Sequence, residues 1–180
     1  MQLSSAAKPG WDGSDFLSYD AAMRSLEATN LEFFETSKHR IVGRAHLSAS
    51  PERVFASFAE PSEWPKWFPM LRSATWIGQA GGVGSEREVR MGGGLGVFRE
   101  RFIAWEPGVR YSFTMFETSS PLVNQLAEDY RLAPEDGGTR LDWVMAGAPT
   151  TIGRIAWPVT KALLGSFFRR GGKKLETLLR

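Results

Sequence analysis

Ser50-Pro51-Glu52-Arg53-Val54-Phe55, followed shortly by Trp64-Pro65-Lys66-Trp67-Phe68-Pro69, is the stretch of sequence that decides the fold. The serine offers a capping hydroxyl, the next proline stands where a missing N–H costs nothing, and the glutamate favours the helix dipole, so a short helix begins here. In the second segment the prolines limit the backbone to one brief turn of helix, yet two tryptophans and a phenylalanine supply large apolar groups to bury. We expect the two short helices to form a wedge that closes one end of a larger structure.

The rest of the chain alternates between strands and turns until one long helical segment ends it. Turn residues separate the strands, as in Gly92-Gly93-Gly94 and Glu135-Asp136-Gly137-Gly138. Connections this short join antiparallel neighbours, because a parallel crossover needs a dozen residues or more. The sequence therefore predicts one antiparallel sheet of about seven strands. The predicted strands are Arg40–Ser48, Leu71–Ile77, Gly84–Met91, Val97–Trp105, Arg110–Thr118, Asn124–Ala133 and Thr139–Gly147.

Several local motifs stand in a characteristic order: Ala49–Phe55, Trp64–Pro69, Val83–Arg87, Trp105–Gly108 and Tyr130–Trp143. With the order of elements around them, they make the chain resemble the START-like superfamily, also called SRPBCC or Bet v 1-like, which includes polyketide cyclase/dehydrase-type proteins. The resemblance implies an α+β helix-grip fold, in which a curved antiparallel sheet of about seven strands wraps around a long C-terminal helix, with two short helices after the first strand.

The resemblance covers roughly residues 34–180 and therefore predicts two parts. Residues 34–180 are expected to form the START-like ligand-binding domain, and residues 1–33 an N-terminal arm. Within the arm, Asp20 is predicted to cap a short helix that ends at Asn30, with Ala22, Met23 and Leu26 on its buried side.

Composition agrees with one globular domain. A chain of 180 residues with 42% hydrophobic content is long enough to form one hydrophobic core and to enclose an internal cavity. The absence of cysteine excludes a disulfide framework and thiolate chemistry. No apolar run is long enough for a signal peptide or a membrane span, so we expect a cytoplasmic protein.

Other chemistries find little support in the sequence. His39 and His46 are seven residues apart, which points them to opposite faces of a strand, so no metal site is expected. The glycine runs at 78–84 and 92–96 lack the dinucleotide and Walker spacings, so no cofactor is expected. Aromatic residues alternate toward the inside of strands instead of lying along a basic stripe, which argues against a nucleic-acid partner.

The alternation of apolar residues predicts an aromatic interior that carries a few polar groups. Arg87, Glu100 and Glu128 fall on inward faces, and so does Tyr130. A charge inside an apolar interior is costly unless it is paired, so these four residues are predicted to form an internal polar cluster. The alternative is that a one-residue bulge turns each charge outward into an ordinary cross-strand ion pair. The predicted ligand-binding residues are Trp67, Phe68, Arg87, Phe98, Phe102, Phe113, Met115, Tyr130, Trp143, Leu164, Phe167 and Phe168.

Two functions are compatible with such a cavity. In the first, the protein binds, sequesters or transports a hydrophobic small molecule or lipid, and the polar cluster only orients it. In the second, which the resemblance implies, the protein is a polyketide cyclase, aromatase or dehydratase. Arg87 would hold a carbonyl or enolate oxygen, Tyr130 would donate a proton, and Glu128 or Glu100 would act as base. We favour binding, because the cavity lacks a recognisable His or Asp acid–base pair.

The terminal helix leaves a third function open. Residues 150–180 carry seven basic residues and one acidic residue in an amphipathic pattern. Such a helix can pack on its own sheet, which we favour, or it can contact an anionic membrane surface or a regulated partner. Pro158 is expected to kink or restart the helix, and Gly171-Gly172 could let its end hinge. A homodimer through the arm or the sheet edge is a further open alternative.

Overall fold

The sheet dominates the computed structural model, which describes residues 23–180. Its strands run in the order β2-β8-β7-β6-β5-β4-β3, every neighbouring pair is antiparallel, and β1 pairs with the end of β6. The predicted strands are confirmed to within a few residues at their ends. The bounds are β1 Arg24–Ser25, β2 His39–Leu47, β3 Leu71–Ile77, β4 Glu86–Met91, β5 Gly96–Glu106, β6 Arg110–Thr118, β7 Val123–Glu135 and β8 Gly138–Pro149.

Tight turns set the register of the hairpins. Between β7 and β8, Glu135 pairs with Gly138, and the two residues between them, Asp136 and Gly137, both have positive φ (47° and 75°). Positive φ at both central positions defines the two-residue hairpin turn that matches the twist of the flanking strands. The long β7–β8 ladder that follows brings inward-facing residues of both strands to one side of the sheet.

The wedge forms as predicted. Helix α3 (Pro51–Ala59) begins at Ser50, whose hydroxyl accepts a hydrogen bond from the Arg53 N–H at 3.3 Å. A 3₁₀ turn, η1 (Pro61–Glu63), then leads into α4 (Trp64–Trp67). Both tryptophans of α4 are buried, so the wedge fills the space between the sheet and the terminal helix.

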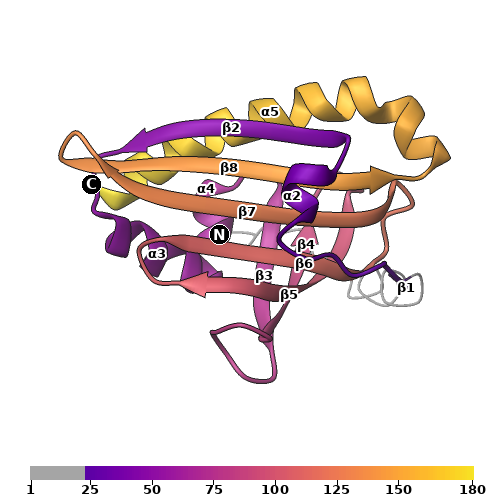
Figure 1. Ribbon diagram of the computed structural model, residues 1–180, viewed down its shortest axis with the longest axis horizontal. Coiled ribbons are helices and arrows are strands. Elements are labelled where there is room, and N and C mark those ends of the chain that lie inside the picture. Colours follow the sequence, from indigo (N-terminus) through magenta and orange to yellow (C-terminus); the bar gives the residue numbers. More distant parts are fainter. Residues whose placement is uncertain (1–22) are drawn as a thin grey trace, which may run out of the picture.

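Helix α5 (Thr151–Leu179) packs along β2 and against α4, while the four-residue α2 (Phe33–Thr36) contacts β7 and β8 (Figure 1). The helix runs through Pro158 without a break, so the alternative that it restarts there is wrong. Gly171 and Gly172 are buried and let the helix approach its neighbours, since a Cβ on Gly172 would lie 3.2 Å from the Cβ of Ala45. These glycines serve close packing, and the helix continues through them without a break.

The predicted helix in the N-terminal arm is wrong for the residues that the structure describes. Residues 23–30 are not helical; Arg24 and Ser25 form β1 beside Thr118 and Glu117 of β6. Residues 24 and 25 can form a strand here because the pairing of β6 with β7 ends at Thr114. The last residues of β6 therefore have a free edge that can pair with another strand. Asp20, Ala22 and the stretch 10–18 lie outside the described residues.

A smaller correction concerns the start of β4. The predicted strand began at Gly84, with Val83 on the inner face, but β4 begins at Glu86 and Val83 is 68% exposed in the loop before it. Of the other residues predicted to face inward on this strand, Arg87 and Val89 are buried and Met91 is half-buried.

Candidate functional site

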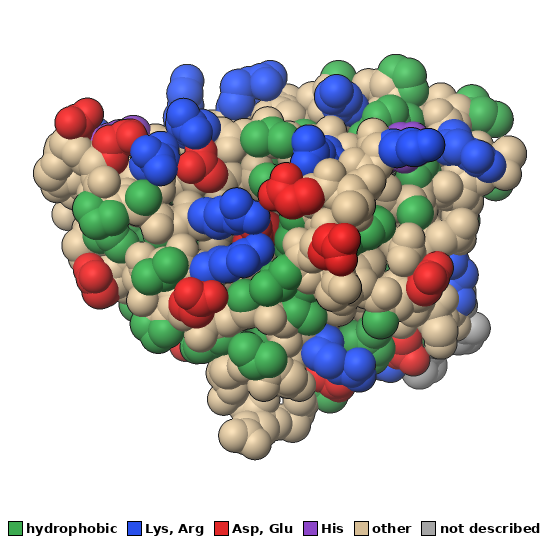
Figure 2. All heavy atoms as spheres, in the orientation of Figure 1, with side chains coloured by type: hydrophobic (Ala, Val, Ile, Leu, Met, Phe, Trp, Pro, Cys, Tyr) green, Lys and Arg blue, Asp and Glu red, His purple; other side chains and the backbone are tan. Residues whose placement is uncertain are grey.

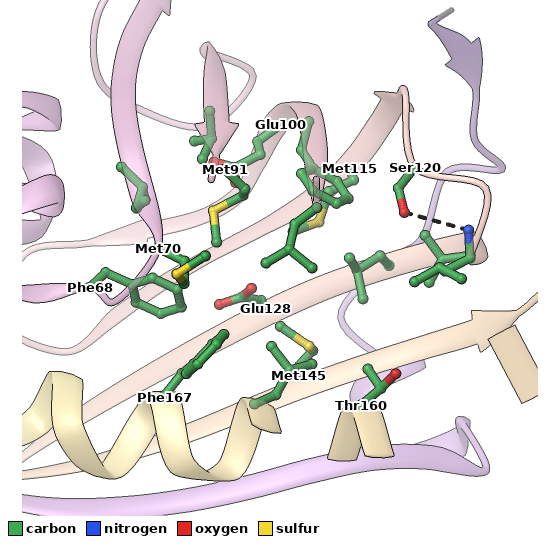
Figure 3. A pocket seen from close by; sticks show the side chains of 18 of the residues that line it. Phe68, Met70, Met91, Glu100, Met115, Ser120, Glu128, Met145, Thr160 and Phe167 are labelled. Carbon is green, nitrogen blue, oxygen red and sulfur yellow. Dashed lines mark hydrogen bonds between the residues drawn. The ribbon is translucent and has the colours of Figure 1, made fainter. Parts of the chain in front are cut away.

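A cavity of about 310 Å³ lies between the concave face of the sheet and α5. Strand residues such as Phe98, Phe113 and Met145 form one side of it, and Leu164 and Phe167 of α5 form the other (Figure 3). Most of the lining is aliphatic, aromatic or thioether, and the volume lies at the lower end of the range found for small-molecule sites. The cavity is therefore built to take an apolar guest.

Arg87 and Glu100 form a buried ion pair in the cavity wall. They are direct partners across the β4–β5 ladder, and their side chains are 1% and 5% exposed. Nε and Nη2 of Arg87 donate to Oε2 of Glu100 at 2.8 and 2.6 Å, and Nη1 donates to the hydroxyl of Tyr111 at 3.2 Å. The guanidinium carbon lies 4.4 Å from the centre of the Trp64 ring, in the range of a cation–π contact. The wedge thus holds the arginine from one side while the sheet pairs it from the other.

Glu128 is the second buried carboxyl group of the lining. Its Oε2 accepts hydrogen bonds from the hydroxyl of Tyr130 and, at 2.9 Å, from Nε1 of Trp143. Both donors come from the sheet, Tyr130 from β7 and Trp143 from the neighbouring β8. Figure 3 shows the carboxyl group of Glu128 pointing into the cavity between Phe68 and Phe167. Oε2 of Glu128 is thus hydrogen-bonded to the sheet, and the carboxyl group is accessible to a guest in the cavity.

Burial sets the electrostatics of these groups. It raises the pKa of Glu100 to about 7, against the opposing effect of Arg87, and it also raises the pKa of Glu128, against its hydrogen bonds from Tyr130 and Trp143. Burial, the largest single effect, lowers the pKa of Arg87, but the charge and hydrogen bonds of Glu100, together with Tyr111 and Tyr130, more than offset it, so the pKa is raised and the arginine is a cation. The site therefore holds one fixed positive charge and two carboxyl groups that resist ionisation.

The structure separates the predicted site residues into two layers. All four members of the predicted polar cluster are buried, so the alternative that bulges turn the charges outward is wrong. Seven of the predicted ligand-binding residues and both glutamates line the cavity. These are Phe68, Arg87, Phe98, Phe113, Met115, Leu164, Phe167, Glu100 and Glu128.

Five predicted ligand-binding residues lie outside the lining: Trp67, Phe102, Tyr130, Trp143 and Phe168. They fill the packed end of the interior instead: the rings of Trp143 and Phe168 stack at 4.6 Å, and Phe102 meets Tyr111 edge-on at 4.8 Å. Alternation tells which face of the sheet a side chain occupies, but it does not tell how deep that side chain lies.

Some lining residues were not predicted. Leu126, Val89, Met91 and Met145 carried the alternation signal and could have been chosen. Others come from loops, from the wedge or from the helix, where the alternation of a strand does not apply. They include Trp64, Met70, Leu95, Leu122, Trp157, Thr160 and Leu163.

Within residues 23–180, no group of His, Asp or Glu is arranged to hold a metal ion, and no helix is long and apolar enough to cross a membrane. His39 meets the edge of Trp157, whereas His46 lies 3.0 Å from the carbonyl of Glu135.

A curved antiparallel sheet that grips a long C-terminal helix over an internal cavity is the START-like, or Bet v 1-like, architecture. A START superfamily protein from Mycobacterium smegmatis shares it, with a TM-score of 0.62 and 15% identity over 78% of this chain and 97% of that one. A solved protein from Chromobacterium violaceum matches with a TM-score of 0.61 and 26% identity over 78% and 96% of the two chains. The resemblance and the fold class predicted from the sequence are confirmed.

Residues 38–180 match the family described as polyketide cyclase / dehydrase and lipid transport. An uncharacterized protein of Mycobacterium tuberculosis is 37% identical over 149 residues, which cover 82% of this chain and 89% of the relative. The chain belongs to this family.

Proposed function

We propose that the protein binds a hydrophobic small molecule or lipid in the internal cavity and sequesters or transports it. The observation that carries the proposal is an apolar cavity of about 310 Å³ with two buried carboxyl groups in its lining. A guest that buries roughly 300 Å² of apolar surface there gains about 7 kcal/mol, which corresponds to a dissociation constant of about 10 μM before other costs. Apolar contact thus supplies the main favourable free energy of binding.

The charges around the cavity favour an uncharged guest. Arg87 is already paired with Glu100, so the described lining holds no spare cation for an anionic headgroup. An anionic guest would lie near Glu128, and an ionised Glu128 would repel it. Even beside a protonated Glu128, the anion would lose its hydration on entering the cavity, which is costly. Glu128 in its protonated form can donate a hydrogen bond to a carbonyl, ester or hydroxyl oxygen of the guest. The ligand class that fits is an apolar molecule with a neutral oxygen function.

A displacement assay tests both parts of the proposal. The neutral fluorescent probe N-phenyl-1-naphthylamine should bind with micromolar affinity, methyl laurate should displace it, and laurate should do so at least tenfold more weakly at pH 8. Met115→Trp, which fills the cavity from β6, should reduce probe binding at least tenfold. Val109→Trp, at an exposed turn outside the lining, should leave it unchanged. Equal binding by both variants would refute the cavity as the site, and equal displacement by laurate would refute only the preference for a neutral guest.

Catalysis is the second candidate, and the raised pKa values of the two cavity carboxyl groups favour it. A carboxyl group with a raised pKa can serve as both donor and acceptor of a proton during a cyclisation or dehydration. Tyr130 would act only through Glu128, since its hydroxyl is bonded to that group and lies outside the lining. If the protein is an enzyme, Glu128→Gln abolishes turnover of a poly-β-ketone while N-phenyl-1-naphthylamine still binds. Unchanged turnover would exclude Glu128 as the base.

A further inference from the structure

The outer face of α5 carries a row of exposed apolar side chains along its first half. Ile152, Ile155, Val159 and Leu163 are 62%, 80%, 64% and 50% exposed. Their spacing of three and four residues places them on one stripe of the helix, directed away from the buried Gly153 and the sheet. Four large aliphatic groups in one exposed row are unusual for a face that meets only water.

The same face becomes basic in its second half. Arg169, Arg170, Lys173 and Lys174 are exposed, and none of them forms an ion pair with a described residue. At 100° per residue they fall on the same side of α5 as the apolar stripe. Figure 2 shows apolar side chains gathered over the first half of α5 at the upper right and basic ones over its second half toward the upper left. We call this surface, from Ile152 to Lys174, the outer face of α5.

We propose that the outer face of α5 docks on the surface of an anionic lipid bilayer. Four aliphatic side chains can enter the boundary between headgroups and acyl chains, while four cations that have no ion-pair partner among residues 23–180 meet anionic headgroups in the same plane. A nucleic acid would match the basic half but would leave the apolar half in water. A second copy of the chain offers no acidic complement through this face, because Glu176, the acidic residue of α5, is bonded to Ser48 and Arg180.

The outer face of α5 and the cavity wall lie on opposite sides of the same turns of α5. The inner side of the same helical turns forms the cavity wall through Trp157, Leu164 and Phe167, and Leu163 belongs to both the wall and the exposed stripe. A bilayer on the outer face would therefore lie one helix thickness from the cavity. The docking inference goes beyond the proposed ligand binding, and it can hold or fail independently of the cavity's guest.

Vesicle flotation of the full chain tests the inference. We expect it to float with vesicles of 70% phosphatidylcholine and 30% phosphatidylserine at 0.1 M salt, and to bind pure phosphatidylcholine at least tenfold more weakly. Ile155→Glu/Val159→Glu should lower binding to the anionic vesicles at least tenfold. Val42→Glu, at a site on β2 that is 67% exposed, should leave it unchanged. Lys173→Ala/Lys174→Ala, which keeps the apolar stripe, should lower it at least fivefold.

Several results would overturn the inference. These are failure of the unmodified chain to bind anionic vesicles at 0.1 M salt, unchanged binding by the Ile155→Glu/Val159→Glu variant, and an equal loss in Val42→Glu. Sedimentation of the unmodified chain as a dimer that Ile155→Glu/Val159→Glu dissociates would assign the outer face to a second copy instead.

Discussion

Replacement of Arg87 by leucine tests how the cavity wall is held together. The side chain is 1% exposed, gives two hydrogen bonds to Glu100 and one to Tyr111, and lies over Trp64. Arg87→Leu removes the cation and leaves Glu100 buried without its partner. Breaking a buried pair in this way typically costs about 3–5 kcal/mol, so we expect the free energy of unfolding to fall by about 4 kcal/mol at pH 8.

The same two strands provide a matched control. Arg101 of β5 donates two hydrogen bonds to Glu86 of β4, at 2.9 and 2.7 Å, but its side chain is 46% exposed. Because exposed ion pairs contribute about 0–1 kcal/mol, Arg101→Leu should lower the free energy of unfolding by less than about 1 kcal/mol.

Urea unfolding followed by circular dichroism at pH 8 measures both variants, and the double variant Arg87→Leu/Glu100→Leu completes the test. Removal of both charges should restore most of the lost stability, since an apolar replacement of a buried pair is often neutral. If Arg87→Leu costs no more than Arg101→Leu, or if the double variant is less stable than Arg87→Leu, the reasoning about the buried pair is refuted.

Two further predictions concern pH and packing. Burial raises the pKa of Glu100 to about 7 from an ordinary 4.5, so between pH 4.5 and 7 the folded state binds more protons than the unfolded state. The free energy of unfolding should therefore fall by up to about 3 kcal/mol as the pH rises from 4.5 to 7. Glu100→Gln should flatten this slope in urea titrations at pH 5 and 7, and an unchanged slope would refute the assignment. Gly43→Ala should cost about 1–3 kcal/mol, because a Cβ there would lie 2.2 Å from the Phe168 ring. At Gly165 a Cβ would make only an ordinary 3.7 Å contact with the flexible end of Arg169, so Gly165→Ala should be neutral or stabilise the helix by up to about 1 kcal/mol. Equal melting temperatures for these two variants would contradict the packing described.

Strand positions and the direction of side chains could be predicted because they follow from local alternation. The inward placement of Glu100 and Glu128 is an example: each shares a face with apolar residues two positions away, and the pleat leaves no other direction without a bulge. The ladder registers then bring Arg87 opposite Glu100, which no local pattern contains.

Depth and edge pairing could not be predicted, because they depend on contacts between distant segments. Trp143 lies behind the cavity since Phe168, from α5, stacks on it, and the residue spacing of β8 contains no trace of that contact. Arg24 and Ser25 became a strand because β6 has an unpaired end, although their own neighbourhood favours helix. Local propensity gives way to tertiary partners in both places.

Native mass spectrometry of the protein purified from its own cells tests the central claim most directly. If the cavity binds an uncharged apolar molecule, the unmodified protein should carry an added mass that organic solvent releases as a neutral compound, and Met115→Trp should lack it while keeping the unmodified circular dichroism spectrum. An added mass that persists in Met115→Trp, or a protein that carries none and also fails to bind N-phenyl-1-naphthylamine, would contradict the account.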